Sequence, residues 1–295
     1  MIMHKYLRAV GFSKFTRKRD IERLLRELAK NAVSKKHIQL DIDSNICEIR
    51  AELAPGMGVA MAGELGDDGE FHEEYYYPYL NSPDPTSYAE CSIQRHAEKE
   101  TYAGLLDEYH VGISLIFYMT NSMEYLERLQ RKGRKFYPLS ANLTGLSVSG
   151  KVILPIRKTA RQIETARVAA RNRDNLLEAA KNGDPDAMET LTIEDMDLYS
   201  QISRRVMKED IYSIIETCFM PSGIECDQYS MIGDIRRVDT LVNSVTGEKV
   251  YNLTVECNDL TFHVGINQED LLGEPLPGRR FKGKVWMQGN VNFSA

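Results

Sequence analysis

One segment near the C-terminus combines basic side chains with the chain's only tryptophan. Arg279 and Arg280 are followed by Lys282, Lys284 and Trp286, which occupy every second position. Because successive side chains of a strand point to opposite faces, these three residues are expected on one face. Lysine pairs with phosphate and an indole ring stacks on bases, which predicts a single-strand nucleic-acid site. The same pattern is also typical of a solvated edge strand whose tryptophan packs on a neighbouring domain.

A second candidate site is formed by His72 and Glu74, which are expected on one face of a tyrosine-rich strand. An imidazole beside a carboxylate is suited to metal binding or to acid–base catalysis. Tyrosine-rich strands more often serve only as sheet, with their hydroxyls at the surface. His96 and His110 flank an acidic segment, but their spacing matches no metal motif and favours a surface role.

Other catalytic patterns are missing from the sequence. It contains no P-loop and no nucleophile elbow, and Gly56-Met-Gly58 lacks the rest of a dinucleotide fingerprint. Cys226 lies between Glu225 and Asp227, whose negative charges disfavour a reactive thiolate. We therefore expect no cofactor and no metal site, and the protein is more readily explained as a non-enzyme.

Charge is distributed in blocks along the 295 residues, although the net charge is only -6. Residues 1–40 carry 11 basic and 3 acidic side chains, and residues 41–120 carry 3 and 16. Residues 121–175 are again basic and residues 176–235 acidic. Such blocks favour contacts with one another, within the fold or across a homodimer, over a basic patch for a partner.

The five cysteines are scattered and odd in number, which argues against a disulfide framework or a zinc site. Free cysteines indicate a reducing compartment. The first residues lack a long apolar run, so no secretory signal is expected. The longest apolar run, residues 111–119, is too short to span a bilayer as a helix. A cytoplasmic protein without a membrane segment is expected.

The N-terminal region is predicted to open with a helix that starts near Thr16. Ile21, Leu24, Leu25 and Leu28 recur at helical spacing and predict one buried stripe. The opposite face is basic: Arg17, Lys18, Arg19, Arg23, Arg26 and Lys30. In the next segment Cys47, Ile49, Ala51 and Leu53 alternate with polar residues, which predicts a half-buried strand.

The middle of the chain is predicted to hold strands and then helices. Further strands are expected at 111–119, at 146–154 and on either side of an Asp68-Gly69 turn. Helices are expected from Asn121 to Gly133, from 159 to 182, and in two pieces that start at Asp184 and Thr192. The basic residues of 157–173, Arg157 and Lys158 among them, are expected to pair with the acidic segment 184–197, and contact with phosphate is the alternative.

The last 70 or so residues are predicted to form a small barrel. The expected order is one long bent strand, two strands joined at Asn258-Asp259, a helical turn, and two strands separated at Gln288-Gly289. Five strands with a short helix before the fourth are typical of an oligonucleotide/oligosaccharide-binding (OB) barrel. The expected class is α+β: a mixed α/β-sheet domain over 1–155, a helical segment over 156–210, and a small OB-like β-barrel over 211–295.

Three stretches carry a resemblance to a known family. They are MHKYLRAVGFSKF (3–15), DLYSQISRRVMKEDIYSIIETCFMPSGIECDQYSMIGDI (197–235) and DLLGEPLPGRRFKGKVWMQGNVNF (270–293). They resemble an uncharacterised clostridial family of unknown function over essentially the whole chain. The resemblance implies a cytoplasmic bacterial protein and carries over no catalytic residues.

Three hypotheses on function follow from the sequence. The leading one is a non-enzymatic binding or assembly module, with a homodimer or a protein partner as its candidate assemblies. The second is single-stranded nucleic-acid binding through Arg279, Arg280, Lys282, Lys284 and Trp286. The third is an enzyme that uses the strand of His72 and Glu74.

Overall fold

The computed structural model describes residues 4–32, 34–41, 44–66, 70–95, 101–131, 136–156, 159–224 and 226–294. The chain divides into two compact units, each described here by itself. Unit 1 comprises residues 1–153 and 217–295, and unit 2 comprises residues 154–216. About 30% of the residues are helical and 45% are in strands, which confirms the α+β class.

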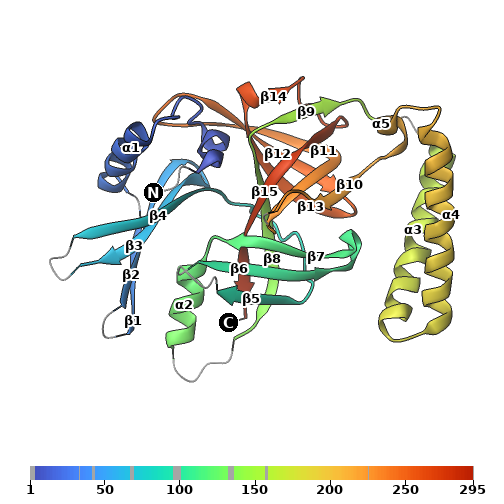
Figure 1. The fold of residues 1–295 in the computed structure, drawn as a ribbon, viewed down its shortest axis with the longest axis horizontal. Helices are drawn as coiled ribbons and strands as arrows, with labels where there is room; N and C mark the ends of the chain where they lie inside the picture. The colour runs from blue at the N-terminus through green and yellow to red at the C-terminus, as the bar shows by residue number, and fades with distance from the viewer. Residues whose placement is uncertain are drawn as a thin grey trace. The chain divides into compact units, whose positions relative to one another are not determined.

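Unit 1 contains a four-stranded antiparallel sheet in the order β1-β2-β3-β4 (Figure 1). Its strands are β1 (Ser34–Asp41), β2 (Ser44–Ala54), β3 (Met57–Leu65) and β4 (Phe71–Leu80). β3 and β4 are the pair expected around the Asp68-Gly69 turn, which itself lies outside the described residues. The 3-10 helix η1 (Lys5–Val10) and the α-helix α1 (Lys18–Lys30) pack on this sheet through a common hydrophobic core.

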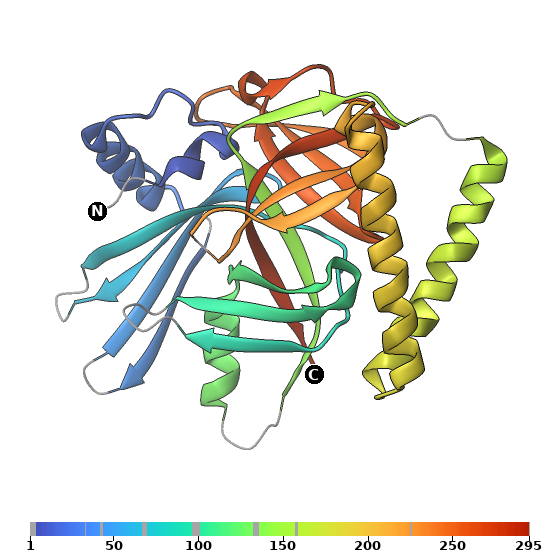
Figure 2. The ribbon, with the colours of Figure 1, turned by 45° about the vertical axis from the view of Figure 1, so that its right-hand side comes forward.

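The second sheet of unit 1 has eleven strands (Figure 2). They are β5 (Cys91–Arg95), β6 (Tyr102–Glu108), β7 (Ile113–Met119), β8 (Pro138–Ser147), β9 (Gly150–Ile153), β10 (Cys218–Pro221), β11 (Gln228–Val242), β12 (Lys249–Cys257), β13 (Leu260–Asn267), β14 (Leu271–Leu272) and β15 (Arg280–Phe293). Three short helices accompany them: η2 (Tyr109–Val111), α2 (Ser122–Gln130) and η3 (Gln268–Asp270). α2 begins after Asn121 as predicted, whereas its predicted end, Gly133, lies outside the described residues.

Five strands of this sheet form a closed ring of pairings. β11 pairs with β12, β12 with β13, β13 with β8, β8 with β15, and β15 with β11. The β13–β8 pair is parallel and the other four are antiparallel. β8 comes from the N-terminal half of the chain, so the ring joins two segments that are distant in sequence.

The predicted division of the chain differs from the observed one at the C-terminus. Residues 211–295 were expected to fold as a domain of their own. In the structure the strands β11–β15 share a sheet with β5–β9, because β8 lies between β13 and β15. Residues 217–295 therefore belong to the same compact unit as residues 1–153.

The predicted turn at Gln288-Gly289 is wrong, because β15 continues through both residues to Phe293. Gly289 is needed for close approach of two strands. A Cβ atom there would lie 2.7 Å from the main-chain oxygen of Asn142, on β8. The fifth place in the ring is consequently taken by β8 and not by a separate C-terminal strand.

Unit 2 contains two long helices and one short one: α3 (Ala160–Lys181), α4 (Pro185–Val206) and α5 (Ile211–Ile214). α3 begins with a capping box at Thr159, and α4 begins at Asp184 with proline in its first turn, as predicted. The predicted second start at Thr192 is wrong. The Thr192 hydroxyl donates to the carbonyl of Met188, one turn back, so the helix continues through this residue.

Gln288 connects β15 to the four-stranded sheet. Its fully buried side chain accepts a hydrogen bond from the Leu80 main-chain N–H (3.0 Å) and donates one to the Pro78 carbonyl (3.1 Å). A Gln288→Leu variant leaves both main-chain groups buried without a partner. We expect its free energy of unfolding to fall by about 2–4 kcal/mol in urea denaturation.

Gln94→Leu on the exposed face of β5 is the matched control and is expected to change stability by no more than about 0.5 kcal/mol. Equal stability of the two variants would show that the Gln288 bonds do not join the sheets.

Candidate anion-binding site

The outer face of α1 carries a line of four cations. Arg19, Arg23, Arg26 and Lys30 follow one another at intervals of four, three and four residues, which places them on one side of the helix. All four are exposed. Together with Arg17 and the two carboxylates Asp20 and Glu27, they line an open surface hollow of about 640 Å³, in which cations outnumber carboxylates by five to two.

The opposite face of α1 is the apolar stripe expected from the sequence. Ile21, Leu24, Leu25 and Leu28 are all buried, which confirms the predicted helix and its core face. They pack in one cluster with Cys47, Ile49, Ala51 and Leu53 of β2, whose burial confirms the predicted apolar face of that strand. Glu48 on the opposite face is buried as well, so the predicted alternation of burial does not hold there. Since apolar and basic stripes lie on opposite sides of a short helix, burying the first exposes the second.

Few carboxylates neutralise the cations of this stripe. The exposed pair Arg23–Asp20 has a separation of 3.5 Å, and Arg26 donates to the main-chain oxygen of Glu22. Within the part of the chain that the structure describes, Arg17, Arg19 and Lys30 have no carboxylate at ion-pair distance. The hollow therefore offers positive charge to a ligand from solution.

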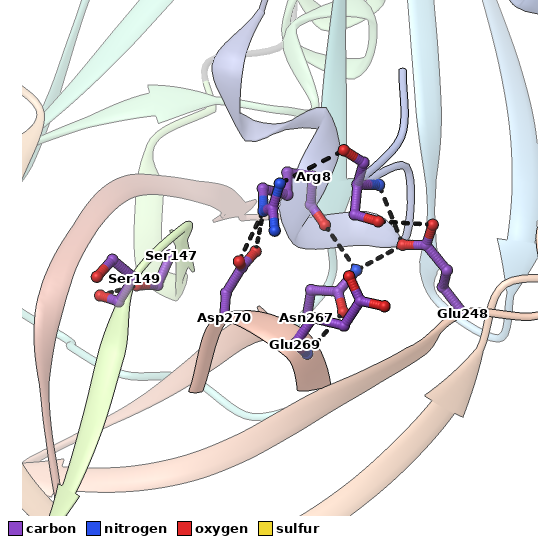
Figure 3. A network of polar contacts seen from close by, with 8 residues as sticks. Arg8, Ser147, Ser149, Glu248, Asn267, Glu269 and Asp270 are labelled. Carbon is purple, nitrogen blue, oxygen red and sulfur yellow. Dashed lines mark hydrogen bonds and ion pairs between the residues drawn. The ribbon is translucent and has the colours of Figure 1, made fainter. Parts of the chain in front are cut away.

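A network of polar contacts attaches the segment before α1 to the larger sheet (Figure 3). Arg8 Nε donates to both carboxylate oxygens of Asp270, at 2.7 and 2.5 Å. This hydrogen bond raises the pKa of Arg8 above its ordinary value, despite the opposing effect of burial. The Asp270 carboxylate is mostly shielded from solvent, so η1 is connected to η3 by a charge-assisted bond.

Glu248 is the second anchor in this network (Figure 3). Its carboxylate accepts hydrogen bonds from the main-chain N–H of Ser13 (3.0 Å), the Ser13 hydroxyl (2.9 Å) and the Asn267 amide (2.6 Å). The Asn267 amide also donates to the carbonyl of Arg8 (3.3 Å). The Arg8 end of the turn that leads into α1 is thus attached to the last residue of β13, and the Ser13 end to the residue before β12, which fixes the base of the helix.

The structure does not bring the predicted strip on β15 together as an exposed surface. Trp286 is 5% exposed and Arg280 is 3% exposed, so neither ring nor guanidinium is accessible. Lys284 is exposed, whereas Lys282 and Arg279 are half-buried. The physical reason is that both faces of β15 are covered at this point, one by each hydrophobic core of unit 1. Trp286 is therefore not the exposed stacking platform that the sequence predicted.

Trp286 is instead the centre of an aromatic cluster. Its ring stacks on Tyr6 with centroids 5.4 Å apart and contacts His4 at 4.6 Å and Tyr118 at 5.3 Å. The indole Nε1 donates to a carboxylate oxygen of Asp227 at 2.7 Å. The ring has a polar partner and an apolar environment, as buried tryptophans require.

His72 and Glu74 are both exposed on β4, and the pairing register with β3 shifts at Glu74. Glu73 between them points the other way. Burial, with the charge of Glu22 on α1, raises the pKa of Glu73 above its ordinary value. Among the described residues, no group of three or more His, Cys, Asp and Glu side chains is placed to hold a metal ion.

Two buried polar constellations were not found from the sequence. On β2, Arg50 pairs with Glu48 at 2.7 Å, and Glu48 accepts from the Tyr77 hydroxyl at 2.6 Å. Burial and the charge of Glu48 raise the pKa of Tyr77 well above its ordinary value. Arg50 also donates to the carbonyl of Thr120, so this ion pair joins the two sheets.

The second constellation contains one of the histidines considered in the sequence. Glu108 is buried and accepts from the Ser87 hydroxyl, and one of its oxygens lies 2.6 Å from His110 Nδ1. The carboxylate is in the middle, so the serine hydroxyl has no imidazole to take its proton. These hydrogen bonds hold the three side chains together and do not activate Ser87 as a nucleophile. His96 and its acidic neighbours Glu98 and Glu100 lie outside the described residues.

The fold and the site together define an α+β chain with a basic helical face. Residues 7–289 match the family model described as a domain of unknown function, E. rectale gene description (DUF3881). The chain belongs to this family, in agreement with the resemblance noted in the sequence. A comparison with curated proteins and a comparison with solved structures each found no match. In the described part of the chain no helix is both long and apolar enough for a membrane crossing.

The burial of Trp286 leads to a stability prediction. A Trp286→Ala variant should lose about 3–5 kcal/mol in its free energy of unfolding, because a large buried ring is replaced by a cavity. The wild-type emission should be that of a buried indole and should not shift when a single-stranded oligonucleotide is added. A melt unchanged by the substitution, together with an emission shift on binding, would restore the strip on β15 as the site.

His4 provides a pH prediction. Burial, with a smaller effect of the Lys5 charge, lowers the pKa of His4 from 6.5 to about 4. The folded chain keeps the imidazole neutral, so its contribution to stability is complete above pH 6.5 and is lost as the pH falls towards 4. Relative to His4→Gln, the wild-type free energy of unfolding should fall by up to about 3 kcal/mol across this window in urea titrations.

His72→Gln, at an exposed histidine of the same unit, is the control and should follow the wild-type pH curve. Parallel curves for wild type and His4→Gln would contradict the burial of a neutral imidazole.

Proposed function

We propose that this protein is a non-enzymatic binding module that takes a linear phosphate polyanion along the outer face of α1. The ligand class is a single strand of nucleic acid, bound through its backbone. The observation that carries the proposal is the hollow in which five cations, Arg17, Arg19, Arg23, Arg26 and Lys30, outnumber the two carboxylates Asp20 and Glu27. The chain as a whole is acidic, so attraction of a polyanion must come from a local surface of this kind.

The dimensions of the stripe support a linear ligand. Arg19 and Lys30 are eleven residues apart on one helix, which corresponds to about 16 Å along its axis. This length lets several cations contact successive backbone phosphates of one strand. Arginine adds forked hydrogen bonding to phosphate oxygens, which suits a backbone contact.

The anchoring of α1 supports binding without rearrangement. The helix is attached to the four-stranded sheet by its apolar stripe and to the larger sheet through Arg8 and Ser13. Its cations therefore project from a rigid element, which lowers the entropy lost when a ligand orders them.

A further part of the proposal concerns the ring β11–β12–β13–β8–β15, which we propose is an OB-like barrel. Its support is the closed set of pairings, the one parallel pair β13–β8, and the short helix η3 between β13 and β15. In this proposal the barrel is a scaffold that presents α1, because its tryptophan is used internally.

We also propose a cytoplasmic location. All five cysteines are free, and Cys47 and Cys257 are buried among apolar residues, which suits a reducing compartment.

The binding proposal is tested with a triple variant, Arg19→Gln/Arg23→Gln/Arg26→Gln. Its affinity for a fluorescent single-stranded oligonucleotide of about 20 nucleotides should fall at least about tenfold at low salt. The slope of log affinity against log salt should decrease in magnitude by about 2, because three phosphate contacts are lost. Fluorescence anisotropy at four salt concentrations measures both quantities.

The matched control is Lys151→Gln/Lys208→Gln/Arg237→Gln, which removes the same charge from exposed positions outside α1. It should retain wild-type affinity and slope. An equal loss in both variants, or no binding by the wild type at low salt, would overturn the proposal. A polyphosphate of equal charge should compete with the oligonucleotide, since the contact is to phosphate.

A further inference from the structure

In its described residues, unit 2 consists mainly of two long antiparallel helices, which contact each other and diverge with distance from their connecting turn (Figure 2). Among its described residues the one buried hydrophobic side chain is Ala187. Helical hairpins in folded proteins owe most of their stability to an apolar face packed against other elements. Two helices of 22 residues each therefore need more apolar contact than this hairpin provides by itself.

α4 displays large apolar side chains to solvent. Met188, Tyr199 and Val206 are 47%, 75% and 41% exposed, and their spacings of eleven and seven residues place them along one side of the helix. Further exposed apolar residues on α4 are Ile193, Met196 and Leu198. Asp195 lies on the same side between Met188 and Tyr199 and pairs with Arg173 of α3, so the apolar face is interrupted once. Exposed apolar side chains that gather on one helix face are typical of a helix–helix interface.

The charges of the two helices are complementary. α3 has five basic and three acidic residues, whereas α4 has five acidic and two basic. Within the hairpin, Arg173 on α3 forms ion pairs with two residues of α4, Asp195 at 2.9 Å and Glu194 at 3.9 Å. In the described part of the chain, Arg161, Arg167 and Arg171 of α3 and Asp186, Glu189 and Asp197 of α4 have no ion-pair partner.

We propose that the hairpin α3–α4 docks on the same hairpin of a second copy of this chain, forming a four-helix bundle with two-fold symmetry. The stripe of Met188, Tyr199 and Val206 enters the centre of the bundle, and each α3 lies beside the other copy's α4. A two-fold axis then brings basic α3 and acidic α4 together twice, because the interface is the same surface on both copies. A second copy offers an acidic α4 to the basic α3 of the first copy, and a basic α3 to its acidic α4.

The area available matches that of a stable dimer. Each helix is about 33 Å long and about 10 Å wide, so one face of the hairpin offers about 660 Å². Two such faces bury about 1,300 Å², within the range of specific protein–protein interfaces.

The test is sedimentation equilibrium of the full chain. The wild type should sediment at twice the chain mass of 33.6 kDa. Met188→Glu/Tyr199→Glu should weaken dimerisation at least about 100-fold, since two apolar side chains of the interface become charged. The matched control Tyr88→Glu/Met220→Glu changes the same residue types at exposed positions of unit 1 and should stay dimeric.

A second test reverses charges on α3 and α4, and it applies even if Met188→Glu/Tyr199→Glu unfolds the helices. Arg167→Glu/Arg171→Glu alone should weaken the dimer, and the further changes Asp186→Arg/Glu189→Arg should restore it. A wild type that stays monomeric at 100 µM-scale concentration would overturn the proposal. A dimer unaffected by Met188→Glu/Tyr199→Glu would also overturn it, because another surface would then hold the two copies.

Discussion

Strand β15 forms hydrogen bonds with four different strands, β7, β8, β9 and β11, and the two hydrophobic cores of unit 1 lie on its opposite faces. Phe281, Val285 and Met287 enter one core, and Trp286 enters the other. Gln288 adds two hydrogen bonds to β4. The burial of Trp286 and Arg280 explains why these two residues are structural, whereas Lys284 stays exposed.

The position of the basic helix follows from the same arrangement. The core around Trp286 contains the apolar stripe of α1, and the preceding turn is attached to η3 and β12 through Arg8 and Ser13. With one side of a 13-residue helix buried in this way, its cations can only face solvent. The surface that is available for a polyanion is therefore a consequence of how the interior is packed.

Local patterns in the sequence predicted the helices and strands. The contacts between strands that are distant in the sequence could not be predicted from these patterns. The stripe of α1 and the alternation in β2 were readable because each concerns one face of one element. The burial of Glu48 could not be predicted from its own strand, because its partner Tyr77 is 29 residues away on β4. Gly289 was taken for a turn because close approach of β8 is invisible in one sequence. The sequence predicted the basic face of α1, but the hollow that these cations line is visible only in the folded structure.

Hydrogen–deuterium exchange of the full chain, with and without a single-stranded oligonucleotide, locates the bound ligand on the backbone. The account predicts slower exchange in peptides covering α1, Lys18–Lys30, and no change in peptides covering the basic part of β15 around Lys282 and Lys284. Protection around Lys282 and Lys284 with α1 unchanged would contradict it, because the ligand would then contact the strand and not the helix.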